Sequence, residues 1–186
     1  QKKIDQILFS EHVRKTSSSW YSNFAKEIKK LPNKDCKAFI GCETKINDDQ
    51  GNLDIDQKII DDAEIIMAVV HRFPGEKGQI MKDKKNIQEK VAIQKEFELT
   101  LAAIENSNFH ILGHPMGMSL RRFGLEIKDK MFEEIIVKLK KKDLVFEINS
   151  RYHNNPKKLL DLCLKHDCMF SLGSNAHSTN ELGQII

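Results

Sequence analysis

Residues 64–71 read EIIMAVVH, an uninterrupted apolar run that ends in a histidine. A short continuous apolar run is typical of a strand that is buried on both faces, as in a parallel sheet covered by helices. The histidine, His71, comes directly after the last apolar residue and is expected at the carboxyl end of this strand. The stretch therefore predicts a buried parallel strand with a polar side chain at its tip.

The segments on either side of this run alternate between strand and helix patterns. Strands are expected at 7–10, 37–46, 64–70, 109–112, 144–148 and 169–172, and helices at 17–31, 56–63, 86–105, 129–142 and 155–166. Polar loops are expected at 74–86 and 115–128, and residues 178–186 have the pattern of a beginning helix. Such alternation predicts an α/β fold with parallel strands. A (β/α) barrel and an open doubly wound sheet both fit, but the glycine-rich phosphate loop common in the second is missing after the first strand.

Length and composition favour a single globular domain over residues 1–186. The chain has 186 residues, of which 40% are hydrophobic and 31% charged, enough for a substantial core. The net charge of +3 is too small to indicate a nucleic-acid partner. No apolar segment approaches the roughly 20 residues that cross a bilayer, and the first residues lack a signal-peptide pattern. We therefore expect a cytoplasmic protein whose four cysteines, without CxxC spacing, are reduced and mostly buried.

Potential ligands occur at or near the carboxyl end of each expected strand. They are Glu11 and His12 in FSEH, Glu43 in GCE, His71 in VVH, His114 in LGHP, Glu147, Asn149 and Arg151 in FEINSR, and Asn175 and His177 in GSNAH. In a parallel barrel all these strand ends gather at one face, where barrel active sites are built. Neutral imidazole nitrogens and carboxylate oxygens suit zinc, manganese and iron. A single histidine at a strand end is ordinary, and GSNAH could also be a turn, so the prediction of a metal site depends on the whole set.

The succession FSEH, GCE, VVH, LGHP, EINSR and GSNAH resembles the polymerase and histidinol phosphatase (PHP) superfamily, and within it the histidinol-phosphatase-like phosphoesterases. The resemblance runs from about Gln6 to the last residue. It implies a distorted (β/α)7 TIM-like barrel that binds two or three divalent metal ions (Zn, Mn or Fe). It also implies the ligand set: Glu43 bridges two metals, His71 and His114 complete one of these sites, His12 and His177 serve another metal, and Asn175 occupies a ligand position.

Two departures from the family pattern affect these expectations. The family's first strand, with its His-x-His pair, is missing from this sequence and would precede Gln1, which implies an N-terminally incomplete barrel. Asn175 stands where the family normally has an aspartate. An amide oxygen is a neutral and weaker ligand, so the metal at that position is expected to bind less tightly.

The resemblance implies a metal-dependent phosphoesterase that hydrolyses a small phosphorylated metabolite through a metal-bound hydroxide. Arg72 and Arg151 are candidates for binding the substrate phosphate, because arginine offers a fork of donors. Two other functions are compatible with the sequence: a binding or scaffold domain whose catalysis is impaired, suggested by Asn175, or a PHP-type nuclease. The small net charge and the lack of an aromatic and basic groove argue against the nuclease.

Overall fold

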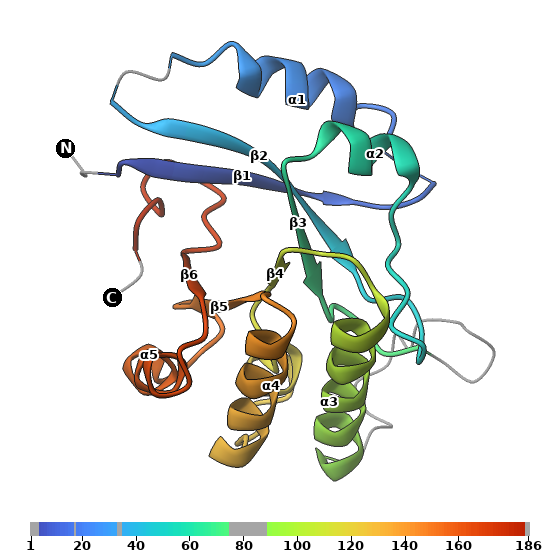
Figure 1. Cartoon of the computed structure of the whole chain (residues 1–186), viewed down its shortest axis with the longest axis vertical. Helices are drawn as coiled ribbons and strands as arrows, with labels where there is room; N and C mark the ends of the chain where they lie inside the picture. The colour runs from blue at the N-terminus through green and yellow to red at the C-terminus, as the bar shows by residue number, and fades with distance from the viewer. Residues whose placement is uncertain (1–3, 17, 33–34, 75–88, 185–186) are drawn as a thin grey trace.

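The computed structural model describes residues 4–16, 18–32, 35–74 and 89–184, in which strands and helices alternate (Figure 1). The elements are β1 (Gln6–Val13), α1 (Tyr21–Lys29), β2 (Lys37–Lys45), α2 (Gln57–Asp62), β3 (Ile65–Val69), α3 (Glu89–Asn106), β4 (Ile111–Leu112), the π-helix η2 (Met118–Arg122), α4 (Asp129–Lys141), β5 (Val145–Asn149), α5 (Pro156–Lys165) and β6 (Phe170–Gly173). Every expected strand is present. The expected loop at 115–128 contains η2, and residues 179–183 form turns in place of the expected helix. Most of the expected loop at 74–86 lies outside the described residues.

The strands form one parallel six-stranded sheet in the order β1-β2-β3-β4-β5-β6. Each strand pairs with the next strand along the chain, whereas a doubly wound sheet reverses its order at a switch point. The doubly wound alternative is therefore excluded. The sheet curls into a half-barrel with β1 and β6 as its edges (Figure 1). The expectation of a barrel-type α/β fold is confirmed at this level, and the seventh strand stays a prediction.

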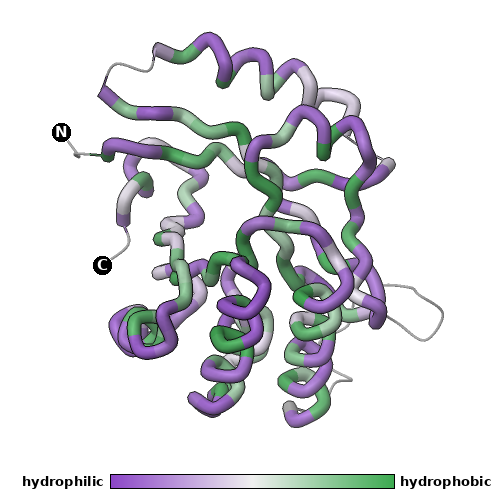
Figure 2. The backbone as a smooth tube through the Cα atoms, in the orientation of Figure 1, coloured by the Kyte–Doolittle hydropathy of each residue, from purple (hydrophilic) through white to green (hydrophobic). Residues whose placement is uncertain are grey.

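The helices cover the convex face of the sheet and enclose the main core there. Alternate strand residues such as Ala68, Phe146 and Ile148 meet the inner faces of the helices, where Ile135 and Leu139 of α4 are fully buried. Burying each large apolar side chain stabilises the fold by about 1.5–3 kcal/mol. Figure 2 shows an apolar β3 beside helices that alternate between polar and apolar residues.

A smaller apolar cluster fills the concave side of the curl. It consists of Met67, Val69 and Ile111, with the partly buried Leu8, Ile65 and Val145 packed against them. Successive side chains of a strand point to opposite faces, so β3 sends Ile66 and Ala68 to the helices and Met67 and Val69 to the inside of the curl. This alternation also fixes where the side chains that follow each strand must point.

Local signals in the sequence explain where two of the helices begin. The Asp56 carboxylate accepts the Ile59 backbone N–H at 3.0 Å and caps α2. The Asn155 side chain caps α5 by accepting the Lys158 N–H at 3.1 Å, and Pro156 occupies the first turn. Both are preferred N-terminal arrangements. They anchor the helices that return the chain to β3 and β6.

Cys42, Cys163 and Cys168 are buried and Cys36 is half-buried, which agrees with the expectation that the cysteines are mostly buried. Among the described helices, none is both long and apolar enough to cross a bilayer.

Candidate metal centre

The carboxyl ends of β1, β2 and β3 bring three predicted ligands together. His12 pairs with Glu43 in the register of β1 and β2, so the two side chains share a face of the sheet. His71 lies two residues after Val69 on the continuation of β3, and the period of two places it on the concave side as well. Strand pairing and the alternation of side chains along β3 therefore position these side chains.

The three side chains meet at one carboxylate oxygen. Oε1 of Glu43 lies 2.8 Å from Nε2 of His71 and 3.4 Å from Nδ1 of His12. Within the described residues, His12, Glu43 and His71 form the one group whose ligand atoms all lie within 4.8 Å of one another. Ions bound at about 2.0–2.2 Å space their ligands about 3 to 4 Å apart. The donor types and their spacing thus fit a divalent metal ion.

His114 adds a third imidazole from the residues after β4. Its Nε2 lies 3.8 Å from the same oxygen of Glu43, and its ring centroid lies 5.6 Å from that of His71. The ring stacks on Tyr152 at 4.0 Å with an interplanar angle of 12°. With 3% of its surface exposed, His114 is the most deeply buried of the three histidines.

The electrostatics of Glu43 and His71 suit metal binding. Burial opposes ionisation of Glu43, but hydrogen bonds from His114 and His71 outweigh it and hold the pKa of this carboxyl far below its ordinary value. Burial lowers the pKa of His71, which keeps its imidazole neutral. Burial also opposes the charging of His114, but Glu43, Glu147 and Glu96 together raise its pKa. An ionised carboxylate beside a neutral imidazole is a good donor set for a first-row metal.

The other two predicted ligands, Asn175 and His177, lie in a second group with Arg151. Nη1 of Arg151 donates to the Asn175 carbonyl at 3.2 Å and lies 3.4 Å from Nδ1 of His177. The same Nδ1 is 2.9 Å from the Asn175 carbonyl, and Glu181 accepts the His177 N–H. The backbone of Asn175 is left-handed, with φ of +48°, a conformation that asparagine tolerates better than most residues. The ligand roles of Asn175 and His177 stay predictions.

The arginines near the centre differ in their surroundings. Arg72 and Arg151 are both exposed. Arg122, at the end of η2, donates from Nη1 to the carbonyl of His71 at 2.8 Å and so supports the backbone of a candidate ligand. Neither this contact nor the stacking of Tyr152 on His114 leaves a signal in the sequence, because both depend on how distant loops fold back.

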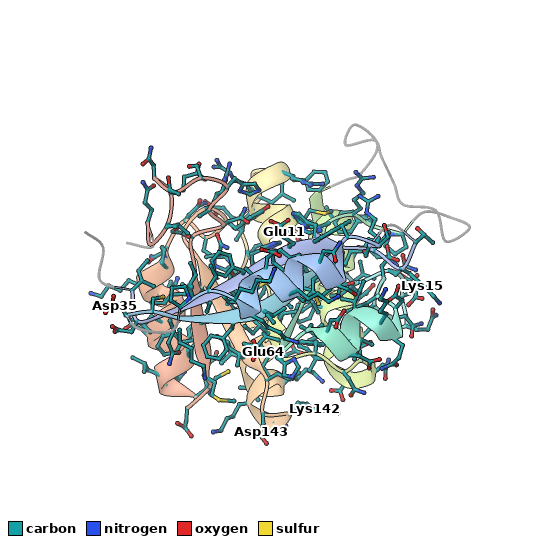
Figure 3. All side chains as sticks on the ribbon, turned by 90° about the horizontal axis from the view of Figure 1, so that it is seen from above. Glu11, Lys15, Asp35, Glu64, Lys142 and Asp143 are labelled. Atoms are coloured by element: carbon teal, nitrogen blue, oxygen red, sulfur yellow. The ribbon has the colours of Figure 1, made fainter. Side chains whose placement is uncertain are left out.

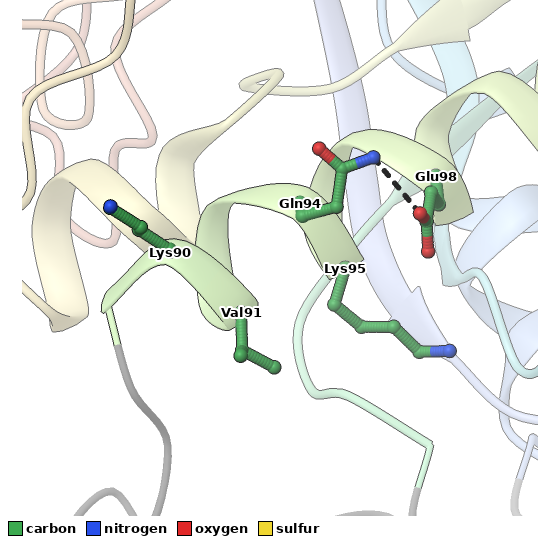
Figure 4. Close-up of a pocket in the computed structure, with 5 residues that line it drawn as sticks. All are labelled: Lys90, Val91, Gln94, Lys95 and Glu98. Carbon is green, nitrogen blue, oxygen red and sulfur yellow. Dashed lines mark hydrogen bonds between the residues drawn. The ribbon is translucent and has the colours of Figure 1, made fainter.

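A hollow along the outer side of α3 contains none of the candidate ligands (Figure 4). It is lined by Lys90, Val91, Gln94, Lys95 and Glu98, and Gln94 donates to Glu98 at 2.9 Å. Among the described residues, the side chains that line it all belong to α3. The chemistry therefore belongs to the strand ends and not to this hollow.

Comparison with known proteins agrees with this architecture. No protein-family model matches the chain. The chain is 28% identical over 153 residues to a probable phosphatase of Clostridium novyi, covering 78% of this chain and 54% of that protein. It is 27% identical over 189 residues to a probable phosphatase of Clostridium acetobutylicum, covering 95% and 68%. The chain thus spans about half to two thirds of the length of these relatives.

A solved structure shares the fold. It is histidinol phosphate phosphatase from Lactococcus lactis, complexed with zinc, L-histidinol and phosphate. The TM-score is 0.59 at 19% sequence identity, with 91% of this chain and 73% of that chain covered. The chain therefore has a histidinol-phosphatase-like fold.

Proposed function

We propose that this protein is a metal-dependent phosphoesterase that hydrolyses a small phosphorylated metabolite. One observation carries the proposal: three imidazoles from three separate strand ends surround a single buried carboxylate oxygen of Glu43. The names of the relatives support a phosphatase, and the Lactococcus structure with the same fold holds zinc and phosphate. The proposed class is that of the PHP superfamily, which the motifs resemble.

The residues of this chain would hold two or three divalent ions of zinc, manganese or iron. Glu43, His12, His71 and His114 would form the main set, with His177 and the weaker ligand Asn175 completing it. When bound, such ions activate a water molecule and offset the negative charge of the phosphoryl oxygens. Glu43 is 7% exposed, and its low pKa keeps it ionised throughout the neutral range.

The substrate phosphate would be bound beside this cluster. Arg151 is the stronger candidate, because its guanidinium already lies against the Asn175–His177 segment. Arg72 directly follows His71 and is exposed, so its side chain is accessible to a ligand. The planar fork of arginine fits phosphate oxygens in pairs. Loss of either arginine should weaken phosphate binding more than metal binding.

The test is hydrolysis of phosphomonoesters, including L-histidinol phosphate and p-nitrophenyl phosphate, by the full-length protein with added zinc or manganese. Activity should require the metal. It should fall in Glu43→Gln by more than the roughly 10–100-fold typical of residues that only support a metal ligand. Glu64→Gln is a matched control, because Glu64, which is labelled in Figure 3, accepts a backbone N–H from Ile40 at 2.8 Å and directly precedes the first residue of β3. Metal-loaded protein without turnover, or turnover that survives Glu43→Gln, would refute the proposal.

A second candidate function is a binding domain with impaired catalysis. Asn175 favours it, because a neutral amide oxygen replaces a charged ligand at a position that the family pattern assigns to metal. An impaired protein should retain fewer ions after purification than the two or three of an intact site. Metal analysis of the purified protein separates the two functions.

A further inference from the structure

A buried carboxylate lies behind the metal centre, on β5. Glu147 is 5% exposed, and both of its oxygens accept hydrogen bonds from the protein. Oε2 accepts the backbone N–H of His114 at 2.6 Å, and Oε1 accepts from Nδ2 of Asn149 at 3.0 Å. Glu147 therefore contacts the candidate metal ligand His114 through its backbone N–H.

The backbone that Glu147 holds is in an unusual conformation. His114 has φ of +29° and Met116 has φ of +61°, which place both in the left-handed region. Non-glycine residues remain there only when their surroundings enforce it. The surroundings here are three buried side chains: Glu147 accepts from His114, His153 contacts the Pro115 carbonyl through Nε2 at 3.0 Å, and Glu96 accepts from Met118 and Ser119 at 2.9 and 2.6 Å. Glu147 is the one that bonds to His114 itself.

The neighbouring strand leaves space for this carboxylate. A Cβ at Gly173 of β6 would lie 1.8 Å from Oε1 of Glu147 and 2.9 Å from Nδ2 of Asn149. Only glycine therefore lets the Glu147 side chain lie where it does. Asn149 in turn accepts the Arg151 N–H on its Oδ1 at 3.0 Å. One carboxylate is thus connected to the turn of His114 and, through Asn149, to the turn of Arg151.

We propose that Glu147 is a positioning residue of the metal centre, which sets the place of the His114 imidazole by holding the His114 backbone. This inference rests on the proposed metal-dependent function. Glutamine at this position keeps the shape but replaces one acceptor oxygen by a donor, which would face either the His114 N–H or Nδ2 of Asn149. Rotating the Asn149 amide would relieve this conflict only by breaking its bond to Arg151. The substitution should therefore displace the His114 imidazole while leaving every candidate metal ligand present.

The experiment measures Zn²⁺ affinity of the full-length protein by competition with a chromophoric chelator. Glu147→Gln should weaken binding by about 10-fold or more, as for other residues that orient metal ligands. The same substitution in a His114→Ala background should cause no further loss, because its effect passes through the imidazole. The control Glu64→Gln, which alters another carboxylate bonded to a backbone N–H, should bind like the parent.

Each outcome has a separate meaning. If the parent and His71→Ala bind Zn²⁺ equally poorly, the proposed function fails and this inference fails with it. If His71→Ala loses Zn²⁺ while Glu147→Gln binds like the parent, the inference alone is wrong. An equal loss from Glu147→Gln with and without His114 also overturns it. If Glu147→Gln does not fold, Asn149→Ala replaces it as the test, because it removes the second partner of the Glu147 carboxylate. It must give a smaller loss of Zn²⁺ affinity that again depends on His114. Parent-like affinity of Asn149→Ala would overturn the proposal.

Discussion

Replacing Gly173 by alanine tests whether β6 is shaped around the Glu147 carboxylate. The new Cβ would lie 1.8 Å from Oε1 and 2.7 Å from Cδ of Glu147, and 2.9 Å from Nδ2 of Asn149. Carbon cannot approach these atoms so closely, so the carboxylate or the strand must move. Because Glu147 is buried, moving it breaks its hydrogen bonds to His114 and Asn149.

The expected cost follows from these contacts. Overpacking a filled interior costs about 1–3 kcal/mol, and each of the two hydrogen bonds lost costs about 0.5–1.5 kcal/mol. Alanine restricts the unfolded chain more than glycine does, which raises the free energy of unfolding by about 0.4–1 kcal/mol. We expect Gly173→Ala to lower the free energy of unfolding by about 3 kcal/mol.

The assay is urea denaturation at pH 7, followed by circular dichroism, in the parent and in a Glu147→Ala background. Removing the Glu147 side chain clears the space, so Gly173→Ala should be close to neutral there. Gly124→Ala is the comparison, because no atom of the described residues beyond its chain neighbours lies within 4 Å of its Cβ position, and the left-handed φ of +68° opposes it. Its cost should be about 1 kcal/mol. A cost of Gly173→Ala that is below about 0.5 kcal/mol, or equal in both backgrounds, would refute the reasoning.

Three further predictions concern other parts of the molecule. Burial lowers the pKa of His153 from 6.5 to about 4. As the pH falls, the unfolded chain therefore binds a proton at His153 before the folded chain does. The free energy of unfolding should fall by up to about 3 kcal/mol between pH 6.5 and 4. Urea denaturation across this range should show that extra fall in the parent but not in His153→Gln, and equal curves would contradict it. Asn175→Asp should tighten Zn²⁺ binding about 10-fold in calorimetric titrations by adding a charged ligand, whereas unchanged affinity would remove residue 175 from the ligand set. Tyr21→Phe deletes the buried hydroxyl that donates to the Gly41 carbonyl at 2.8 Å and should cost about 1 kcal/mol in urea denaturation; no loss would contradict that estimate.

The sheet and the convergence of His12, Glu43 and His71 could be predicted because both depend on local patterns. Apolar runs bounded by turns located the strands, and parallel pairing then placed their carboxyl ends at one face. The register of β1 and β2 makes His12 and Glu43 direct partners, so their side chains lie side by side on the same face of the sheet. The convergence of these side chains with His71 therefore follows from a period of two and from strand order.

The supporting contacts could not be predicted, because they join residues with no regular spacing. Glu147 is 26 positions from Gly173 and meets it only because β5 and β6 pair with Glu147 opposite Ser171. The stacking of Tyr152 on His114 and the bond from Arg122 to His71 depend on the conformations of loops. The π-helix after His114 is likewise held by the buried Glu96 of α3. Such contacts are set by packing in three dimensions, where sequence periodicity gives no information.

Anomalous scattering at the zinc absorption edge, from crystals equilibrated with Zn²⁺, tests the central claim most directly. The account predicts a peak bounded by Nδ1 of His12, Oε1 of Glu43 and Nε2 of His71, about 2.0–2.2 Å from each bound atom. The peak should vanish in Glu43→Gln and persist in Glu64→Gln. A parent protein whose zinc peak lies elsewhere, or whose crystals show none between these three residues, would contradict the account.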